Sequence, residues 1–523
     1  MRHLIVVPIA RFAGRPRRGG LIVALLLGEP PHGIYRIFPL RLQNQRFHRY
    51  SNVIRLTKHP SAGIARAAGR CAALTALLLV LLGGAASAQM KAPEKEFTRF
   101  TLDNGLEVVV IENRLVPIAT VELAVRNGSF TEGPEYSGLS HLYEHMFFKG
   151  NSRYADMGEF LTMLGSIGAA WNATTREEVV YYYFTLPVAN LERGMEEMAN
   201  TVQTPRFEPA ALEKEREVVI GELTRFESDP FYEFNRAMDK ATWGDYVTRK
   251  QKEGQRAVIQ TATVEKMRAI QQKYYLPNNS LLIVAGDVDS AGVATLARRY
   301  FSTWKRGADP FVAEPVARPK PLTEKQLVVV PAPGADLAQV QYQWHGPSIG
   351  LDDEATYAAD VLIFILQQQQ SRFQRRLVES GLAQGAGLNY YTQRYVGPIS
   401  AQVVTTPEKT QEALKALWAE IQELDSPGYF TDEELETAKQ ILRINALYES
   451  EQTTDWVHSL SFWWSTAGIE YYRTYIDKLL EVSREDIQRY VRTYIKGKPY
   501  VLGISTNPQA LEKLNLNPKG VLQ

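Results

Sequence analysis

The body of the chain alternates between short apolar runs and longer amphipathic stretches. The runs LEVVVIEN and TVELAVRNG are short, rich in valine and bounded by Asn or Gly, as expected of β-strands. The segments GLSHLYEHMFF, LERGMEEMANTVQ and AALEKEREVVIGELTRF have the three-to-four-residue apolar spacing of helices. Strands and helices mixed in this order predict an α+β fold.

An internal repeat appears further along the chain. The segment TVEKMRAIQQKYYLPNNSLLIVAGD begins at Thr263, and the similar segment SREDIQRYVRTYIKGKPYVLGISTN begins at Ser483. Both have a Ser or Thr helix cap, an amphipathic helix, a turn and an apolar strand. A duplication predicts one domain at 89–310 and a second, homologous domain at 326–523, with a proline- and charge-rich linker at 311–325.

The first 89 residues differ from the rest in charge. They contain thirteen Arg and Lys against one acid, and because the whole chain is +1, the remainder lies near −11. A basic nucleic-acid-binding surface is therefore not expected. Residues 66–88, RAAGRCAALTALLLVLLGGAASA, have the charged start, apolar stretch and small-residue end of a signal peptide. We expect export to a bacterial periplasm; an Arg-rich mitochondrial transit peptide is the alternative.

The signal-like segment lies far from Met1. We therefore expect the true start near residue 53 or 56, and treat residues 1–65 as an extension of unassigned role. The only cysteine, Cys71, lies inside the segment, so a mature chain would have no disulfide and no thiol nucleophile. No apolar run in the body of the chain is long enough to predict a membrane span.

The segment HLYEH, residues 141–145, is the strongest candidate for chemistry. On a helix, His141 and His145 lie on one face and can share a metal ion, and neutral imidazole suits zinc. Glu144 lies beside them, where a carboxylate can act as general base. The order H-x-x-E-H is the inverse of the usual zinc-protease motif. A purely structural pair of histidines is the alternative.

A third ligand has to come from another segment, and EKEREVVIGEL offers candidates. Glu215 and Glu222 are seven residues apart and share one helix face, whereas Glu213 and Glu217 point away. Solvated surface acids are the ordinary alternative. Glu222, however, is flanked by apolar residues, and a carboxylate in such surroundings needs a partner, for which a metal ion would serve.

These motifs together resemble the pitrilysin/insulinase family of zinc metallopeptidases. The resemblance rests on HLYEH, on Glu222 in a later helix, on Glu215 and on AAWNATTREEVVYYYFTLP. It implies two homologous α/β domains, each an antiparallel-rich sheet packed with helices, forming half of a clamshell. The half-length members, such as subunits of the mitochondrial processing peptidase, are the nearest in organisation.

The resemblance also implies roles for individual residues. One Zn²⁺ per chain would be held by His141, His145 and Glu222, with Glu144 as the general base and Glu215 supporting the site. The strand with Trp171, Asn172 and Ala173 would be a sheet edge to which an extended peptide substrate adds. Covering of that edge in the mature protein is the alternative.

One part of the family pattern is missing. Self-sufficient relatives carry an Arg and a Tyr seven apart in the second domain, where this chain has Leu377 and Gln384 in RLVESGLAQ. We therefore expect a homologous partner subunit that supplies the Arg and Tyr, or a homodimer as the alternative. Two other functions stay open: a non-catalytic structural subunit of this fold, and a module that binds peptides without cleaving them.

Overall fold

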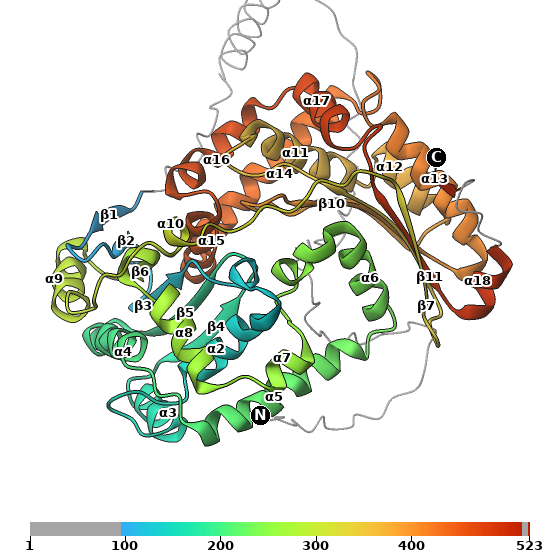
Figure 1. The fold of residues 1–523 in the computed structure, drawn as a ribbon. Helices are drawn as coiled ribbons and strands as arrows, with labels where there is room; N and C mark the ends of the chain where they lie inside the picture. Colours follow the sequence, from blue (N-terminus) through green and yellow to red (C-terminus); the bar gives the residue numbers. More distant parts are fainter. Residues whose placement is uncertain (1–95, 515–520, 523) are drawn as a thin grey trace, which may run out of the picture. The chain divides into compact units, whose positions relative to one another are not determined.

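The computed structural model describes residues 96–514 and 521–522, which belong to one compact unit. The predicted extension (1–65) and the predicted signal peptide (66–88) lie outside the described residues. The described chain forms two sheets with helices packed against them (Figure 1). The α+β prediction is confirmed.

The first sheet has six strands in the spatial order β1-β2-β6-β3-β5-β4. Neighbouring strands are antiparallel except for the parallel pair β2 and β6. Every residue of β6 is buried, as is all of β3 after its first residue, so these apolar strands form the centre of the sheet. The strands are β1 (Thr98–Thr101), β2 (Glu107–Glu112), β3 (Ile118–Val125), β4 (Ala170–Thr175), β5 (Val180–Pro187) and β6 (Ser280–Gly286).

The second sheet has five strands in the order β7-β11-β8-β10-β9. Here too one pair, β7 and β11, is parallel and the other neighbours are antiparallel. The strands are β7 (Gln326–Pro331), β8 (Ala338–His345), β9 (Gly385–Tyr390), β10 (Pro398–Thr405) and β11 (Val501–Thr506).

Helices pack against each sheet. Those that follow the strands of the first sheet are α2 (Leu139–Phe147), α3 (Met157–Ser166), α4 (Leu191–Gln203), α5 (Pro209–Glu227), α6 (Tyr232–Trp243), α7 (Arg256–Gln260), α8 (Val264–Tyr274), α9 (Ser290–Phe301) and α10 (Pro310–Ala313). Those of the second domain are α11 (Asp353–Gln367), α12 (Arg372–Gln374), α13 (Thr410–Glu423), α14 (Asp432–Glu451), α15 (Thr453–Thr466), α16 (Ile469–Glu481), α17 (Arg484–Tyr494) and α18 (Pro508–Leu514).

The two halves repeat one another in structure. Helix α17 has the same length as α8, strand β8 has the same length as β3, and both pairs are separated by the same distance along the chain. The order β2-β6-β3-β5-β4 of the first sheet matches the order β7-β11-β8-β10-β9 of the second. Each half also has its own apolar core. The repeat seen in the sequence is therefore a repeat of fold, and each half can bury its own apolar residues.

A helix of the second half packs on the first sheet. Apolar residues of α15, including Leu460 and Trp464, lie against Val109 and Ile283 on the face of that sheet. A buried polar contact lies among them: the Glu122 carboxylate, which is 0% exposed, accepts hydrogen bonds from the side chains of two α15 residues. These two residues are His458 and Ser461.

The reverse crossing is made by α6, which belongs to the first half of the chain. Its residues Phe234 and Met238 are buried against Val501 of the second sheet. Each half therefore contributes a helix to the other half, and the two are held together by apolar packing at both places.

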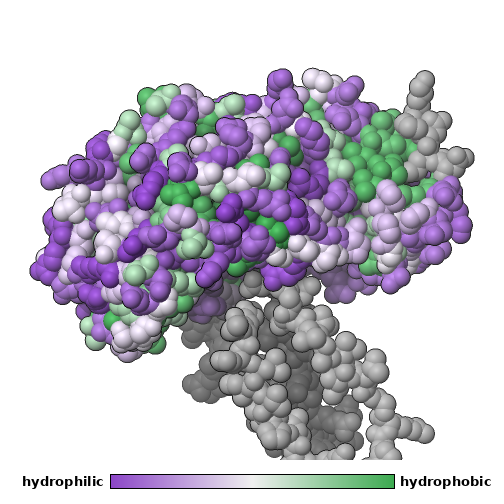
Figure 2. Space-filling model, turned by 60° about the horizontal axis from the view of Figure 1, so that its bottom comes forward, coloured by the Kyte–Doolittle hydropathy of each residue, from purple (hydrophilic) through white to green (hydrophobic). Residues whose placement is uncertain are grey.

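The surface is mixed in character. Figure 2 shows polar residues over most of one face, with the broadest apolar area on the side of the second domain. Among the described residues, no helix combines the length and apolar character that crossing a bilayer requires.

The contact of Glu122 with His458 leads to a prediction about stability. His458→Ala leaves the buried side chain of Glu122 with only one of its two side-chain hydrogen-bond partners, and a buried polar group left without a partner costs about 1–3 kcal/mol. We expect His458→Ala to lower the free energy of unfolding by about 1–3 kcal/mol, measured by urea denaturation. In a double-mutant cycle with Glu122→Gln, the two losses should not add. Additivity within about 0.5 kcal/mol would show that the pair is energetically silent.

Candidate metal centre

Helix α2 (Leu139–Phe147) carries the two histidines of the HLYEH motif. One side of the helix is buried in the core of the first domain, which fixes the direction of the opposite side. His141 and His145 lie one turn apart on that opposite side, with their ring centroids 4.9 Å apart. The core-facing residues are Leu142, Tyr143, Met146 and Phe147.

The first turn of α2 is held by a buried carboxylate from the preceding loop. Glu132 accepts hydrogen bonds from the backbone N–H groups of Gly138 and Ser140, each at 2.7 Å. The first N–H groups of a helix have no partner within the helix, so Glu132 satisfies two of them. Burial raises the pKa of Glu132 to about 7, although the two N–H bonds act in the opposite direction.

A second contact fixes the same end of α2. Gly138 has a φ of +87° and Gly254 a φ of +77°, both in the region that favours glycine. A Cβ added to Gly254 would lie 2.2 Å from the Cα of Gly138, which no side chain could tolerate. The segment that ends at Gly254 therefore packs backbone to backbone on the start of the histidine helix.

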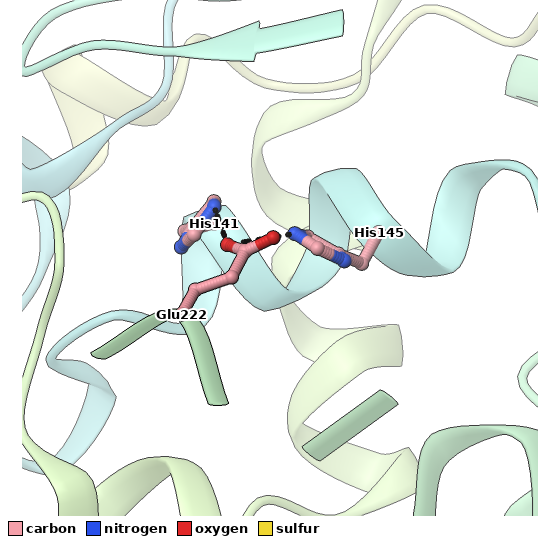
Figure 3. Close-up of side chains that lie close together, drawn as sticks. All are labelled: His141, His145 and Glu222. Carbon is pink, nitrogen blue, oxygen red and sulfur yellow. Dashed lines mark ion pairs between the residues drawn. The ribbon is translucent and has the colours of Figure 1, made fainter. Parts of the chain in front are cut away.

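Helix α5 (Pro209–Glu227) brings the third side chain to the histidines. The Oε2 atom of Glu222 lies 3.6 Å from Nε2 of His141 and 3.7 Å from Nε2 of His145 (Figure 3). One potential ligand atom from each of the three residues lies within 4.8 Å of the other two. Among the described residues, this is the one group of three or more His, Cys, Asp or Glu close enough to hold a metal ion.

The geometry of these three groups fits zinc. Tetrahedral zinc with bonds of about 2.0–2.1 Å needs its ligand atoms about 3.4 Å apart, close to the separations of Glu222 from the two imidazoles. Two imidazoles and one carboxylate form a donor set typical of catalytic zinc, which leaves a fourth position for water or substrate. Burial, and then the neighbouring His145, lowers the pKa of His141 to about 3, so His141 is the neutral imidazole that a metal requires.

Glu215, on the same face of α5, orients His145. Its Oε2 lies 3.2 Å from Nδ1 of His145, which leaves Nε2 directed towards His141 and Glu222. Its other oxygen pairs with the Lys149 ammonium at 2.7 Å. Burial raises the pKa of Glu215, but the bonds from His145 and Lys149 outweigh it and the net shift is downward. A ligand histidine is commonly held by such an acid.

Glu144 lies in the same pocket as the cluster. The pocket has a volume of about 190 Å³, and its lining includes His141, Glu144 and Glu222. Burial raises the pKa of Glu144, and a hydrogen bond of 2.5 Å from the Thr175 hydroxyl to Oε2 opposes that rise. With Oε2 held by Thr175, Oε1 is the oxygen left to exchange protons.

The strand expected to receive substrate lies at the edge of the first sheet. Within the part of the chain that the structure describes, strand β4 (Ala170–Thr175) pairs with β5 only, so no described strand lies beside its outer backbone groups. Trp171 packs on Phe148, Asn172 is exposed and Ala173 is buried. Ala173, Thr174 and Thr175 also line the pocket, so the open strand edge runs directly into it.

The other acids of α5 lie where helical geometry predicts. Glu213 and Glu217 are exposed, whereas Glu215 is only 7% exposed. The expectation that apolar residues surround Glu222 holds in part: Val219 and Leu223 are buried, but Val218 is 46% exposed.

Comparison with known families places the chain. The family profile described as "Insulinase (Peptidase family M16)" matches residues 107–251, and the one described as "Peptidase M16 inactive domain" matches residues 261–442. The chain belongs to peptidase family M16. His141, Glu144, His145, Glu215 and Glu222 all lie within the first of these two matches.

Relatives within M16 include proteins named as zinc proteases. "Zinc protease PqqE" of Helicobacter pylori is 25% identical over 439 residues, which cover 82% of this chain and 96% of that protein. "Uncharacterized zinc protease YmxG" of Bacillus subtilis is 24% identical over 68% of this chain and 85% of its own length.

Solved structures share the M16 fold. A protease from Helicobacter pylori superimposes with a TM-score of 0.72 at 23% identity, covering 79% of this chain and 99% of that one. The first half of the periplasmic protease PqqL from Escherichia coli gives 0.69 at 19% identity, covering 82% and 96%. Against whole PqqL the TM-score is 0.68 at 19% identity, and 82% of this chain matches 50% of that one.

Two other residues stand at the positions where an Arg and a Tyr were expected. Leu377 is fully buried in the core of the second domain, within a short π-helical segment, Arg375–Glu379. Gln384 is exposed and directly precedes β9, and its backbone N–H donates to the carbonyl of Val404 in β10. Neither side chain lines the pocket beside the candidate metal site.

Three residues of the site were not identified from the sequence. Helical spacing could have indicated Lys149, because it lies four residues beyond His145 and eight beyond His141 and so on the same helix face. No sequence pattern indicated Glu132 or Thr175, since each acts through a contact formed only in the folded chain.

The cap on α2 leads to a prediction about pH. The pKa of Glu132 is about 7 in the folded chain against 4.5 as its ordinary value, so folding favours the protonated form. This contribution to stability is fully present below pH 4.5 and is lost as the pH rises through about 7. The free energy of unfolding of the wild type, relative to Glu132→Gln, should therefore fall by up to about 3 kcal/mol between about pH 4.5 and 7.5.

Urea denaturation of both proteins over this pH series measures the difference. Glu135→Gln, at an exposed position of the same loop, is the matched control. A wild-type-minus-variant difference that stays constant with pH would show that Glu132 keeps one charge state throughout.

Proposed function

We propose that this chain is a zinc-dependent endopeptidase that hydrolyses peptides or unfolded segments. The observation that carries the proposal is the convergence of His141, His145 and Glu222 from two helices, with Glu144 in the same pocket. Zinc held by the three residues would supply a Lewis acid that polarises the substrate carbonyl and lowers the pKa of water.

The protein's own groups perform the proton transfers. Glu144, steadied at Oε2 by Thr175, takes a proton from the attacking water at Oε1 and delivers it to the nitrogen of the leaving amine. Glu215 and Lys149 keep the His145 ring in one orientation throughout. Pre-set orientation matters because reacting groups misplaced by about 1 Å lose much of their rate.

The substrate would bind as an added strand. An extended peptide can pair its backbone with the outer edge of β4, at Trp171, Asn172 and Ala173, and the same strand continues into the pocket. Backbone pairing requires an extended chain and does not depend on particular side chains. Binding by strand addition therefore selects unfolded segments over folded ones.

We also propose that a homologous partner subunit supplies the Arg and Tyr that are absent here. The side chain of Leu377 cannot donate a hydrogen bond. Because it is also buried, it cannot take the place of the absent Arg at the substrate. The correspondence of this chain to half of PqqL in fold supports an assembly of two such halves. The apolar area on the second-domain side (Figure 2) is one surface through which a partner could bind. A homodimer is the alternative assembly.

A second candidate function is a non-catalytic structural subunit. The match of residues 261–442 to an inactive-domain profile favours it for the second half of the chain. A peptide-binding module that does not cleave would use the β4 edge without the metal. Neither alternative gives a reason for four polar groups to share one pocket, so we place the peptidase first.

We propose a periplasmic location for the mature protein, on the basis of the signal-like sequence at 66–88. The name of PqqL as a periplasmic protease agrees with it. N-terminal sequencing of the mature protein should begin at about residue 89; retention of residues 66–88 would exclude cleavage there.

The proposal predicts how Glu144→Gln behaves. The variant should keep about one zinc per chain, because Glu144 is not a ligand, and should lose peptide hydrolysis by at least about 100-fold. Metal analysis and a fluorogenic peptide assay measure both. Glu213→Gln, an exposed acid of the neighbouring helix, is the control. Wild-type protein without zinc, or a Glu144→Gln variant with full activity, would refute the peptidase.

The partner hypothesis predicts a rate difference. Loss of one donor to a developing oxyanion typically lowers the rate by about 10² to 10³. The purified chain alone should therefore cleave peptides at least about 100-fold more slowly than the complex isolated from its native host. A chain that reaches the full rate alone, as monomer or homodimer, would exclude the separate subunit.

A further inference from the structure

The pocket beside the candidate metal site is lined by a positively charged side chain that the proposed reaction does not use. Of the described residues that line it, Lys252 is the only one with a positive charge, against the carboxylates of Glu144, Glu222 and Glu253. Its side chain is 33% exposed and its Nζ lies 3.1 Å from Glu253. Lys252 therefore lines the same pocket as His141 and Glu144.

The segment that carries Lys252 is fixed on both sides. Before it, Lys250 donates hydrogen bonds to the backbone carbonyls of Tyr395 (2.9 Å) and Val396 (2.7 Å) in the second domain. After it, Gly254 packs on Gly138 at the start of α2. The backbone of Lys252 is therefore held between the second domain and the histidine helix, and the side chain reaches the pocket from a rigid base.

The second-domain segment that Lys250 contacts is itself held in place. Val396 has a φ of +61°, an unfavourable value for a β-branched residue, and its N–H donates to the Ser348 hydroxyl at 2.9 Å. Such strain persists only where the surroundings impose it. The contact of Lys250 with the carbonyl of this residue is part of those surroundings.

Hydrolysis of a peptide bond places negative charge on the carbonyl oxygen of the bond that is attacked. A cation or hydrogen-bond donor aimed at that oxygen lowers the barrier. Leu377 and Gln384 cannot serve in this pocket, whereas Lys252 lines it with three N–H donors and one charge.

We infer that Lys252 is a further catalytic residue of the proposed peptidase, whose Nζ donates a hydrogen bond to the carbonyl oxygen of the scissile bond as charge builds there. The inference rests on the proposed function. With Lys252 in this role, the chain has one hydrogen-bond donor of its own for the carbonyl oxygen. A partner subunit would then add further donors and would not have to supply all of them.

The test compares three variants of the full chain, in whichever assembly the wild type is active. Lys252→Met removes the charge at similar length, and Lys252→Arg keeps it. Lys273→Met is the matched control, because Lys273 also pairs with a glutamate and is 36% exposed, but lies on α8 outside the pocket. Steady-state kinetics use two peptides that differ only by Glu or Gln beside the scissile bond.

Lys252→Met should lower kcat about 10- to 100-fold on both peptides, with KM changed less than about threefold. Lys252→Arg should restore most of the rate, Lys273→Met should match the wild type, and all four proteins should hold equal zinc. Binding of the uncleaved peptide to Glu144→Gln should be unaffected by adding Lys252→Met, since the interaction forms with the transition state.

Three results would overturn the inference. If Lys252→Met behaves like Lys273→Met, the lysine only pairs with Glu253. If the loss lies in KM and only for the Glu peptide, Lys252 selects acidic substrates. If Lys252→Met loses zinc, the lysine holds the site together. An inactive wild-type assembly would refute the peptidase itself, and this inference with it.

Discussion

The candidate site depends on the fixing of one short helix at both ends. Helix α2 has nine residues, too few to be stable alone, and its apolar side is set by the core. Glu132 and the Gly138–Gly254 contact fix its first turn, and Glu215 with Lys149 fixes the ring of His145 near its last. Only with the helix held in this way do two imidazoles keep a constant distance from Glu222.

The duplication explains why one half of the chain bears a site and the other does not. By position in the fold, α11 and α14 of the second domain correspond to α2 and α5. Where α2 and α5 present polar groups to each other, α11 and α14 meet through buried apolar residues. Those residues include Val361, Leu362, Ala438 and Leu442. At this place the second domain has apolar packing where the first has the cluster of His141, His145 and Glu222, and apolar packing needs no metal ion.

Much of the fold could be predicted because it is encoded locally. The expected helix at residues 191–203 is α4 without change, and the expected strands LEVVVIEN and TVELAVRNG contain all or most of β2 and β3. Periodicity and caps are properties of neighbouring residues, so one sequence shows them. The repeat of the Thr263 segment at Ser483 then indicated the second domain.

The sequence could predict those parts of the site that depend on the geometry of a single helix. The spacing of His141 and His145, and of Glu215 and Glu222, places each pair on one helix face. The approach of α2 to α5 is a tertiary contact between segments far apart in the chain, and the family resemblance, not the spacing, indicated it. Thr175 and Lys252 reach the pocket from a strand and a loop, for which no local pattern exists.

The second domain influences the site, although none of its described residues lines the pocket. Burial lowers the pKa of Lys250 to about 8, while the nearby Glu178 carboxylate opposes that shift. Glu178 in turn accepts the backbone N–H of Arg394 at 2.9 Å. Buried ionisable groups are stable only when they are hydrogen-bonded, and the backbone of the second domain accepts bonds from Lys250 and donates one to Glu178. Displacement of that backbone would release the segment leading to Gly254, and with it the first turn of α2. The geometry of the candidate metal site therefore depends on both domains, although its three potential ligands all come from the first.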